Sequence, residues 1–93
     1  DLDLAKLDEE FTYTITTAIP TNAKGFEVTD TIDEVLAFVG EATVTVAGET
    51  AGKADINGQT LTVTFTEAEV KENPEAEVVI TFKAKINLKR FGI

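Results

Sequence analysis

One acidic residue stands out because its position conflicts with its chemistry. Asp30 follows Phe26 and Val28 at two-residue intervals, so alternation along a strand would point all three side chains toward the same apolar interior. A carboxylate in such a place is costly unless it is paired, hydrogen-bonded or neutralised. Either the strand ends early and Asp30 lies on a solvated rim or caps a turn, or Asp30 is buried and has a chemical task.

The residue types that the chain lacks narrow the chemistry. There is no cysteine, histidine or serine. Disulfides, thiolate metal sites, the usual general base and a Ser-His-Asp triad are therefore ruled out. We expect no cofactor, no metal and no multiple-turnover enzyme. The N-terminal carboxylates match no calcium loop and are interpreted as a solvated acidic turn; they are Asp1, Asp3, Asp8, Glu9 and Glu10.

Length and charge limit the class of protein. The 93 residues suit one domain over 1–93, which we interpret as part of a larger multi-domain surface protein. A net charge of −9 with only 8 Lys and Arg disfavours binding to nucleic acid or to anionic membranes. No apolar run approaches the ~20 residues of a membrane-spanning helix, so membrane insertion is not expected.

Alternation of apolar and polar side chains is the dominant pattern and is typical of half-buried strands. A first run over 11–19 has Tyr13 on its apolar face, and Pro20 ends it because proline lacks a backbone N–H. The longest run covers 78–87. Further strands are predicted over 26–32, 37–39, 42–47 and 61–65, with a short one around Leu2, Leu4 and Leu7.

Turn signals separate these runs. Residues 21–25 and 48–53 are predicted to be polar loops, residues 33–36 a bend or one helical turn, and Asn57-Gly58 a tight hairpin turn. Thr66, followed three residues later by Glu69, predicts a capped short helix that Asn73-Pro74 closes.

Together these elements predict an all-β fold: an antiparallel, immunoglobulin-like β-sandwich of about six or seven strands with Greek-key connections and one short helical turn. A basic stripe lies late in the chain and consists of Lys83, Lys85, Lys89 and Arg90. We interpret it as protection of an edge strand, or alternatively as a partner for acidic residues of a neighbouring domain.

Three strand sequences carry a family resemblance. Phe11-Thr-Tyr-Thr-Ile-Thr-Thr-Ala-Ile-Pro20 is followed by Phe26-Glu-Val-Thr-Asp-Thr-Ile-Asp33, and later by Val78-Val-Ile-Thr-Phe-Lys-Ala-Lys-Ile-Asn87. The chain thereby resembles the isopeptide-forming D2-type (CnaA-like) domains of Gram-positive pilins and cell-wall-anchored adhesins. The resemblance covers nearly the whole chain, and the ordered pair of the first two motifs is its specific part.

The resemblance implies a particular reaction. In that family a Lys amine attacks the side-chain amide of an Asn, and a buried acidic residue, matched here by Asp30, assists the proton transfers. An apolar site favours the neutral amine, and a protonated carboxyl group can polarise the amide and pass a proton to the departing ammonia. The product is a single-turnover covalent staple in a protein without disulfides.

Lys6 and Asn87 are the candidates for the two linked residues. Lys6 is the only lysine near the N-terminus, and Asn87 is the only asparagine near the C-terminus, where alternation points it away from the apolar face. The family's Lys usually lies farther upstream, and its Asn lies on a later strand. The alternatives are therefore a Lys6–Asn87 bond, a fragment without its cross-linking strands, and a degenerate family member.

The expected function is structural. We expect a stalk or display module of a Gram-positive pilin or surface adhesin, secreted and anchored to the cell wall, whose partners are neighbouring domains of the same protein. The alternative is a module whose loops bind a host extracellular protein or a glycan. The loops over 21–25 and 48–53 hold no aromatic residue on which a sugar could stack.

Overall fold

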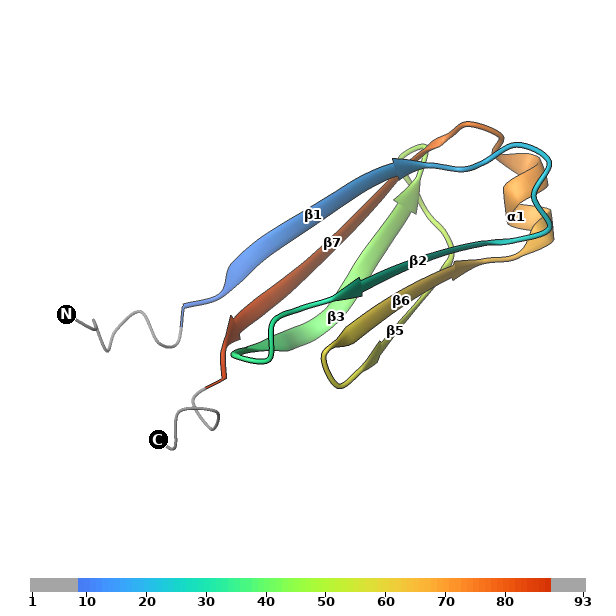
Figure 1. Ribbon diagram of the computed structural model, residues 1–93. Coiled ribbons are helices and arrows are strands. Elements are labelled where there is room, and N and C mark those ends of the chain that lie inside the picture. The colour runs from blue at the N-terminus through green and yellow to red at the C-terminus, as the bar shows by residue number, and fades with distance from the viewer. Residues whose placement is uncertain (1–8, 88–93) are drawn as a thin grey trace.

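The computed structural model describes residues 9–87, which form two facing antiparallel sheets (Figure 1). The four-stranded sheet has the order β1-β7-β3-β4, and the three-stranded sheet has the order β2-β6-β5. The elements are β1 Phe11–Ala18, β2 Phe26–Thr31, β3 Leu36–Val46, β4 Glu49–Thr50, β5 Lys53–Asn57, β6 Thr60–Phe65, α1 Glu67–Glu72 and β7 Glu77–Ile86. The predicted all-β sandwich with one short helix is confirmed.

The core lies between the sheets and comes mainly from their central strands, β6 and β7. Side chains alternate along a strand, so every second residue of each points inward. The predicted inner face of β7 is confirmed, since Val78, Ile80, Phe82 and Ala84 are buried. The remaining buried apolar residues are Ile19, Val44, Val46, Leu61, Val63, Phe65 and Val70. No polar or charged residue is buried within residues 9–87.

The short helix α1 closes one end of the sandwich, and its predicted cap is confirmed. The Thr66 hydroxyl accepts a hydrogen bond from the Glu69 N–H at 3.2 Å, and the Glu69 carboxylate accepts one from the Thr66 N–H at 2.8 Å. Glu69 also accepts a hydrogen bond from the Gly52 N–H at 2.9 Å, which ties the helix to the turn before β5. The backbone hydrogen bond from Thr66, and next that from Gly52, lowers the pKa of Glu69.

The strand β3 differs from the sequence prediction. Separate strands were predicted over 37–39 and 42–47, but β3 runs without interruption from Leu36 to Val46 alongside β7. The register with β7 shifts between Val39 and Thr43, where Gly40 has φ +68°. Glycine adopts this left-handed conformation at little cost, and a bulge bends a strand without ending it. Gly40 therefore marks a bend and not a break.

The region predicted as one polar loop over 48–53 contains more structure. Ala47 and Gly48, with φ values of 51° and 86°, turn the chain so that β4 pairs with the end of β3. The strand β5 was not predicted, because Ala54 and Ile56 are its only apolar side chains. Its pairing with β6 across a turn at Gly58 confirms the predicted hairpin.

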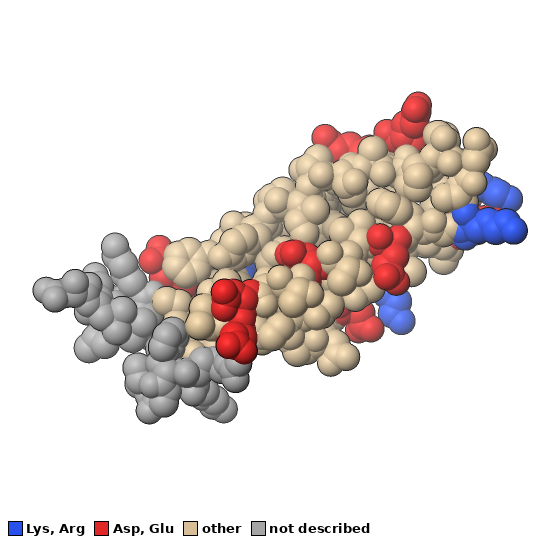
Figure 2. Space-filling model, viewed as in Figure 1, with Lys and Arg blue, Asp and Glu red and all other residues tan. Residues whose placement is uncertain are grey.

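The sheet order overturns the interpretation of Lys83 and Lys85 as edge protection. β7 lies between β1 and β3, so it is a central strand, and its lysines project from the exposed face of the sheet. The Lys83 amine lies 3.9 Å from the Glu10 carboxylate. On the face shown in Figure 2, acidic side chains are spread along the body, and basic side chains gather at the end where α1 lies. Lys89 and Arg90 lie outside the described residues.

Candidate functional site

The candidate site lies at the end of the sandwich opposite α1, which we call the terminal end (Figure 1). β1 begins and β7 ends there, because Phe11 pairs with Ala84 in their antiparallel register. β2 also ends there, since the Ile32 N–H donates to the Gln59 carbonyl at 2.9 Å in the β5–β6 turn. The Gln59 side chain then donates to the Leu36 carbonyl at 2.7 Å and joins the start of β3 to this turn.

Asp30 is half-buried on the inner side of β2 at the terminal end. It is in phase with Phe26 and Val28, which pack against the core, and it lies directly opposite Leu61, which is 1% exposed. Within residues 9–87 its carboxylate has no hydrogen-bond or ion-pair partner. The alternation correctly predicted which way Asp30 faces. Asp30 is not fully buried, because the two sheets cover this end of the core incompletely.

Aromatic rings line the terminal end, and their exposed fractions show how incompletely the two sheets cover the core there. Tyr13 stacks on Phe82 with ring centroids 5.3 Å apart, and Phe38 meets Phe82 edge-on at 5.4 Å. Phe82 is 3% exposed, whereas Phe11 and Tyr13 are 37% and 38% exposed. Tyr13, predicted as a core residue, is therefore only partly covered. The reason is that β1 is an edge strand with no neighbour on its outer side among the described residues.

Of the two candidate linking residues, the structure describes one. Asn87 follows β7 directly, is half-buried, and donates its backbone N–H to the Val35 carbonyl at 2.7 Å. This contact places Asn87 at the same end as Asp30. Lys6 lies outside the described residues, as does the short strand predicted around Leu2, Leu4 and Leu7.

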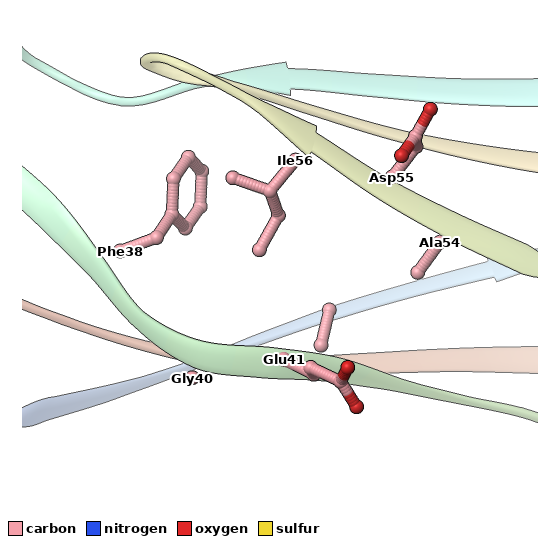
Figure 3. Close-up of a pocket in the computed structure, with 7 residues that line it drawn as sticks. Phe38, Gly40, Glu41, Ala54, Asp55 and Ile56 are labelled. Atoms are coloured by element: carbon pink, nitrogen blue, oxygen red, sulfur yellow. The ribbon is translucent and has the colours of Figure 1, made fainter.

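A groove that the sequence did not reveal opens where β3 faces β5 (Figure 3). Its volume is about 480 Å³, and its lining residues are Phe38, Gly40, Glu41, Ala42, Ala54, Asp55 and Ile56. Phe38 and Ile56 lie next to one another between the strands, while the carboxylates of Glu41 and Asp55 point away from them (Figure 3). The groove could hold an apolar side chain, but it offers no nucleophile paired with a base. The position of the groove depends on the bend of β3 at Gly40. In the sequence nothing but the glycine itself indicates this bend.

The described part of the chain offers neither a metal site nor a membrane-spanning helix. Residues 9–87 contain no group of three or more acidic side chains placed to hold a metal ion. The one helix they form, α1, has six residues and cannot reach across a bilayer.

Comparison with known proteins relates the chain to adhesins and pilins. No family model matches it. It is 51% identical over 84 residues to Platelet adherence protein A of Streptococcus gordonii, an alignment that covers 89% of this chain and 2% of that protein.

Solved structures share the fold. The N-terminal domain of the Streptococcus gordonii adhesin Sgo0707 matches with a TM-score of 0.77 and 28% identity, over 91% of this chain and 22% of that one. BcpA, the major pilin subunit of Bacillus cereus, matches with a TM-score of 0.73 and 26% identity, over 88% of this chain and 25% of that one. The chain thus has the fold of domains of Gram-positive pilins and adhesins, and it spans a small part of each of these proteins.

Proposed function

We propose that this domain is a structural module of a Gram-positive surface adhesin or pilin, and that it spaces or displays other parts of that protein outside the cell. The observation that carries the proposal is the 51% identity to a segment that makes up 2% of Platelet adherence protein A. The absence of His, Cys and Ser from the chain agrees with a role that needs no turnover.

The strand order determines how such a module would respond to pulling. The chain enters β1 and leaves β7 at the same end, and these two strands are antiparallel neighbours. A force applied at these two points would separate the strands one residue pair at a time, starting at Phe11 and Ala84. A covalent bond between the segments that flank the terminal end would carry the force and spare these hydrogen bonds.

The proposed bond is an isopeptide between a Lys amine and an Asn side-chain amide, with Asp30 as the assisting acid. The neutral Lys Nζ attacks the Asn Cγ and a new C–N bond forms. The bond from Cγ to the amide nitrogen then breaks, and ammonia leaves with the proton taken from Nζ. The protonated carboxyl group of Asp30 would donate a hydrogen bond to the amide oxygen and relay that proton.

The surroundings of Asp30 support this role. Asp30 is half-buried in phase with Val28 and lies opposite Leu61, and its carboxylate has no hydrogen-bond or ion-pair partner among residues 9–87. Asn87 lies at the same end, and Lys6 precedes Phe11 by five residues, a length of chain that reaches at most about 18 Å. These two residues remain the candidates for the link.

Exchange of the domain within its parent surface protein tests the structural role. Replacing it with an unrelated immunoglobulin-like domain of similar length should leave cell adhesion unchanged, because a spacer contributes length and not a binding surface. Antibody labelling of the intact cells checks that the altered protein is displayed in equal amount. Loss of adhesion despite equal display would contradict the proposal.

Binding of a host protein or glycan by this domain is the second candidate function. Two observations favour it: the sequence relative is named for adherence to platelets, and a groove lies between β3 and β5. Immobilised host matrix proteins and glycans, probed with the isolated domain, separate the two functions. Saturable binding that Ile56→Glu abolishes would place recognition above spacing, since this change puts a charge against the apolar side of the groove.

A further inference from the structure

β1 is an edge strand that lacks the usual features that prevent pairing with another chain. It is the last strand of its sheet and pairs with β7 in continuous register along its 8 residues. Its sequence, FTYTITTA, contains no charge, no proline and no glycine. An edge strand leaves a row of backbone N–H and C=O groups unpaired, and proteins commonly protect such a row with charges, prolines, bulges or short strands.

The other sheet edges in the described part of the chain carry such protection. β4 is 2 residues long. β2 contains Glu27 and Asp30, and β5 contains Lys53 and Asp55. The part of β3 that extends beyond β4 is bent by the bulge near Gly40. β1 is therefore the one long, straight and uncharged edge among residues 9–87.

The side chains of β1 are also incompletely covered. Three large apolar residues are exposed within the described region, and two of them, Phe11 and Tyr13, lie on β1. The ring of Tyr13 rests on Phe82 and is still 38% exposed. A strand added to the outer edge of β1 would pair its free backbone groups and cover these two rings at the same time.

We propose that the outer edge of β1 pairs with β1 of a second copy of this domain, so that two four-stranded sheets join into one. The sequence is self-complementary in an antiparallel register centred on Thr14. In that register Thr14 faces Thr14 of the second copy, Tyr13 faces Ile15, and Thr12 faces Thr16. On the inner face the apolar side chains of Tyr13 and Ile15 then lie opposite each other, and Phe11 lies opposite Thr17. On the outer face threonine lies opposite threonine over 12–16. The apolar pairs and the threonine pairs are favourable cross-strand pairs.

The charges of the chain allow this arrangement and limit its strength. In the same register Glu10 lies opposite Ala18 and Glu9 lies opposite Ile19, so no like charges face each other along the strand. The net charge of −9 on each copy is repulsive, although salt screens charges more than roughly 8 Å apart at physiological ionic strength.

The size of the proposed interface sets the expected affinity. One strand pair buries less surface than a standard-size interface, so we expect a Kd on the order of 0.1–1 mM. Many copies side by side on one cell surface would raise the local concentration.

Sedimentation equilibrium of the whole chain, at concentrations up to about 1 mM, tests the proposal. The wild-type chain should dimerise, and Thr14→Lys should weaken the association about tenfold or more, because two lysines would face each other at the two-fold axis. Thr64→Lys is the matched control, since it makes the same charge change at an exposed position of the central strand β6. An equimolar mixture of Thr14→Lys and Thr14→Glu should form a heterodimer again. Circular dichroism checks that each variant is folded.

Three results would overturn the proposal: a monomer at the highest concentration, equal association of Thr14→Lys and wild type, or a mixture of charged variants that fails to pair. Hydrogen exchange identifies what covers the edge. Protection of the β1 amides should rise with protein concentration. Full protection at high dilution would mean that the same chain covers this edge, and the second copy would then be excluded.

Discussion

Replacing Gly52 with alanine is expected to lower the free energy of unfolding by about 2–5 kcal/mol. Gly52 has φ +78°, a left-handed conformation that costs other residues about 1–2 kcal/mol. A Cβ at this position would also lie 2.6 Å from Cε1 of Phe65, which is far inside the contact distance of two carbon atoms. Phe65 is 1% exposed, so its ring cannot move away without disturbing the core, and such overpacking adds about 1–3 kcal/mol.

Gly48→Ala is the matched control for this prediction. Gly48 has φ +86°, but a Cβ there would have no atom within 4 Å. The control should therefore show only the backbone cost of about 1–2 kcal/mol. Urea unfolding of both variants gives the comparison. Equal losses of stability would mean that Phe65 yields to the new methyl group and that the core is looser around Gly52 than the contact implies.

Replacing Phe82 with alanine is expected to cost about 3–5 kcal/mol, the usual range for truncating a buried phenylalanine. Phe82 is 3% exposed on the central strand β7, and its ring contacts Tyr13 of β1 and Phe38 of β3. Removing the Phe82 ring abolishes a contact that three strands share at the terminal end. A domain of this size has a total stability of about 5–15 kcal/mol, so the variant should unfold at a much lower temperature.

Phe11→Ala provides the comparison for Phe82→Ala, because it removes the same side chain from the same end of the sandwich. Phe11 is 37% exposed, and we expect a loss of about 1 kcal/mol. Thermal unfolding followed by circular dichroism measures both changes. Similar losses for the two variants would contradict the described packing, in which Phe82 is central and Phe11 is peripheral.

Local patterns in the sequence predicted the elements whose signals are local. The alternation over 11–19 and 78–87 gave β1 and β7 with their inner faces, and the spacing of Thr66 and Glu69 gave the capped helix α1. These features depend on residues within one strand or one helical turn. For that reason they could be derived without knowing how the strands are arranged.

The sheet order could not be derived in this way, because it depends on pairings between residues far apart in the chain. The lysines of β7 were misassigned to an edge, although β7 pairs with both β1 and β3. β5 was missed, since two apolar residues are too few to show a period. The phase of Asp30 was correct, but its degree of burial depends on how closely the two sheets approach at the terminal end.

The roles assigned to Asp30, Lys6 and Asn87 stay predictions. Asp30 and Asn87 lie at the same end of the molecule, as a shared role requires, while Lys6 lies outside the described residues. The groove between β3 and β5 was not predicted, because it arises from the bend in β3 and the edge position of β5.

The mass of the intact, purified chain tests most directly whether Asp30 serves a covalent bond at the terminal end. Formation of the isopeptide releases one ammonia, which lowers the mass by ~17 Da. Asn57-Gly58 can also lose ammonia by closing to a succinimide, so proteolytic mapping is part of the measurement. A succinimide stays within one peptide, whereas the proposed bond joins peptides from the two ends of the chain.

We predict that wild type lies ~17 Da below the mass of its sequence, that its map contains a joined pair of terminal peptides, and that Asp30→Ala has the full sequence mass and two separate peptides. A wild-type chain at its full sequence mass, or a joined pair that persists in Asp30→Ala, would contradict the role assigned to this carboxylate.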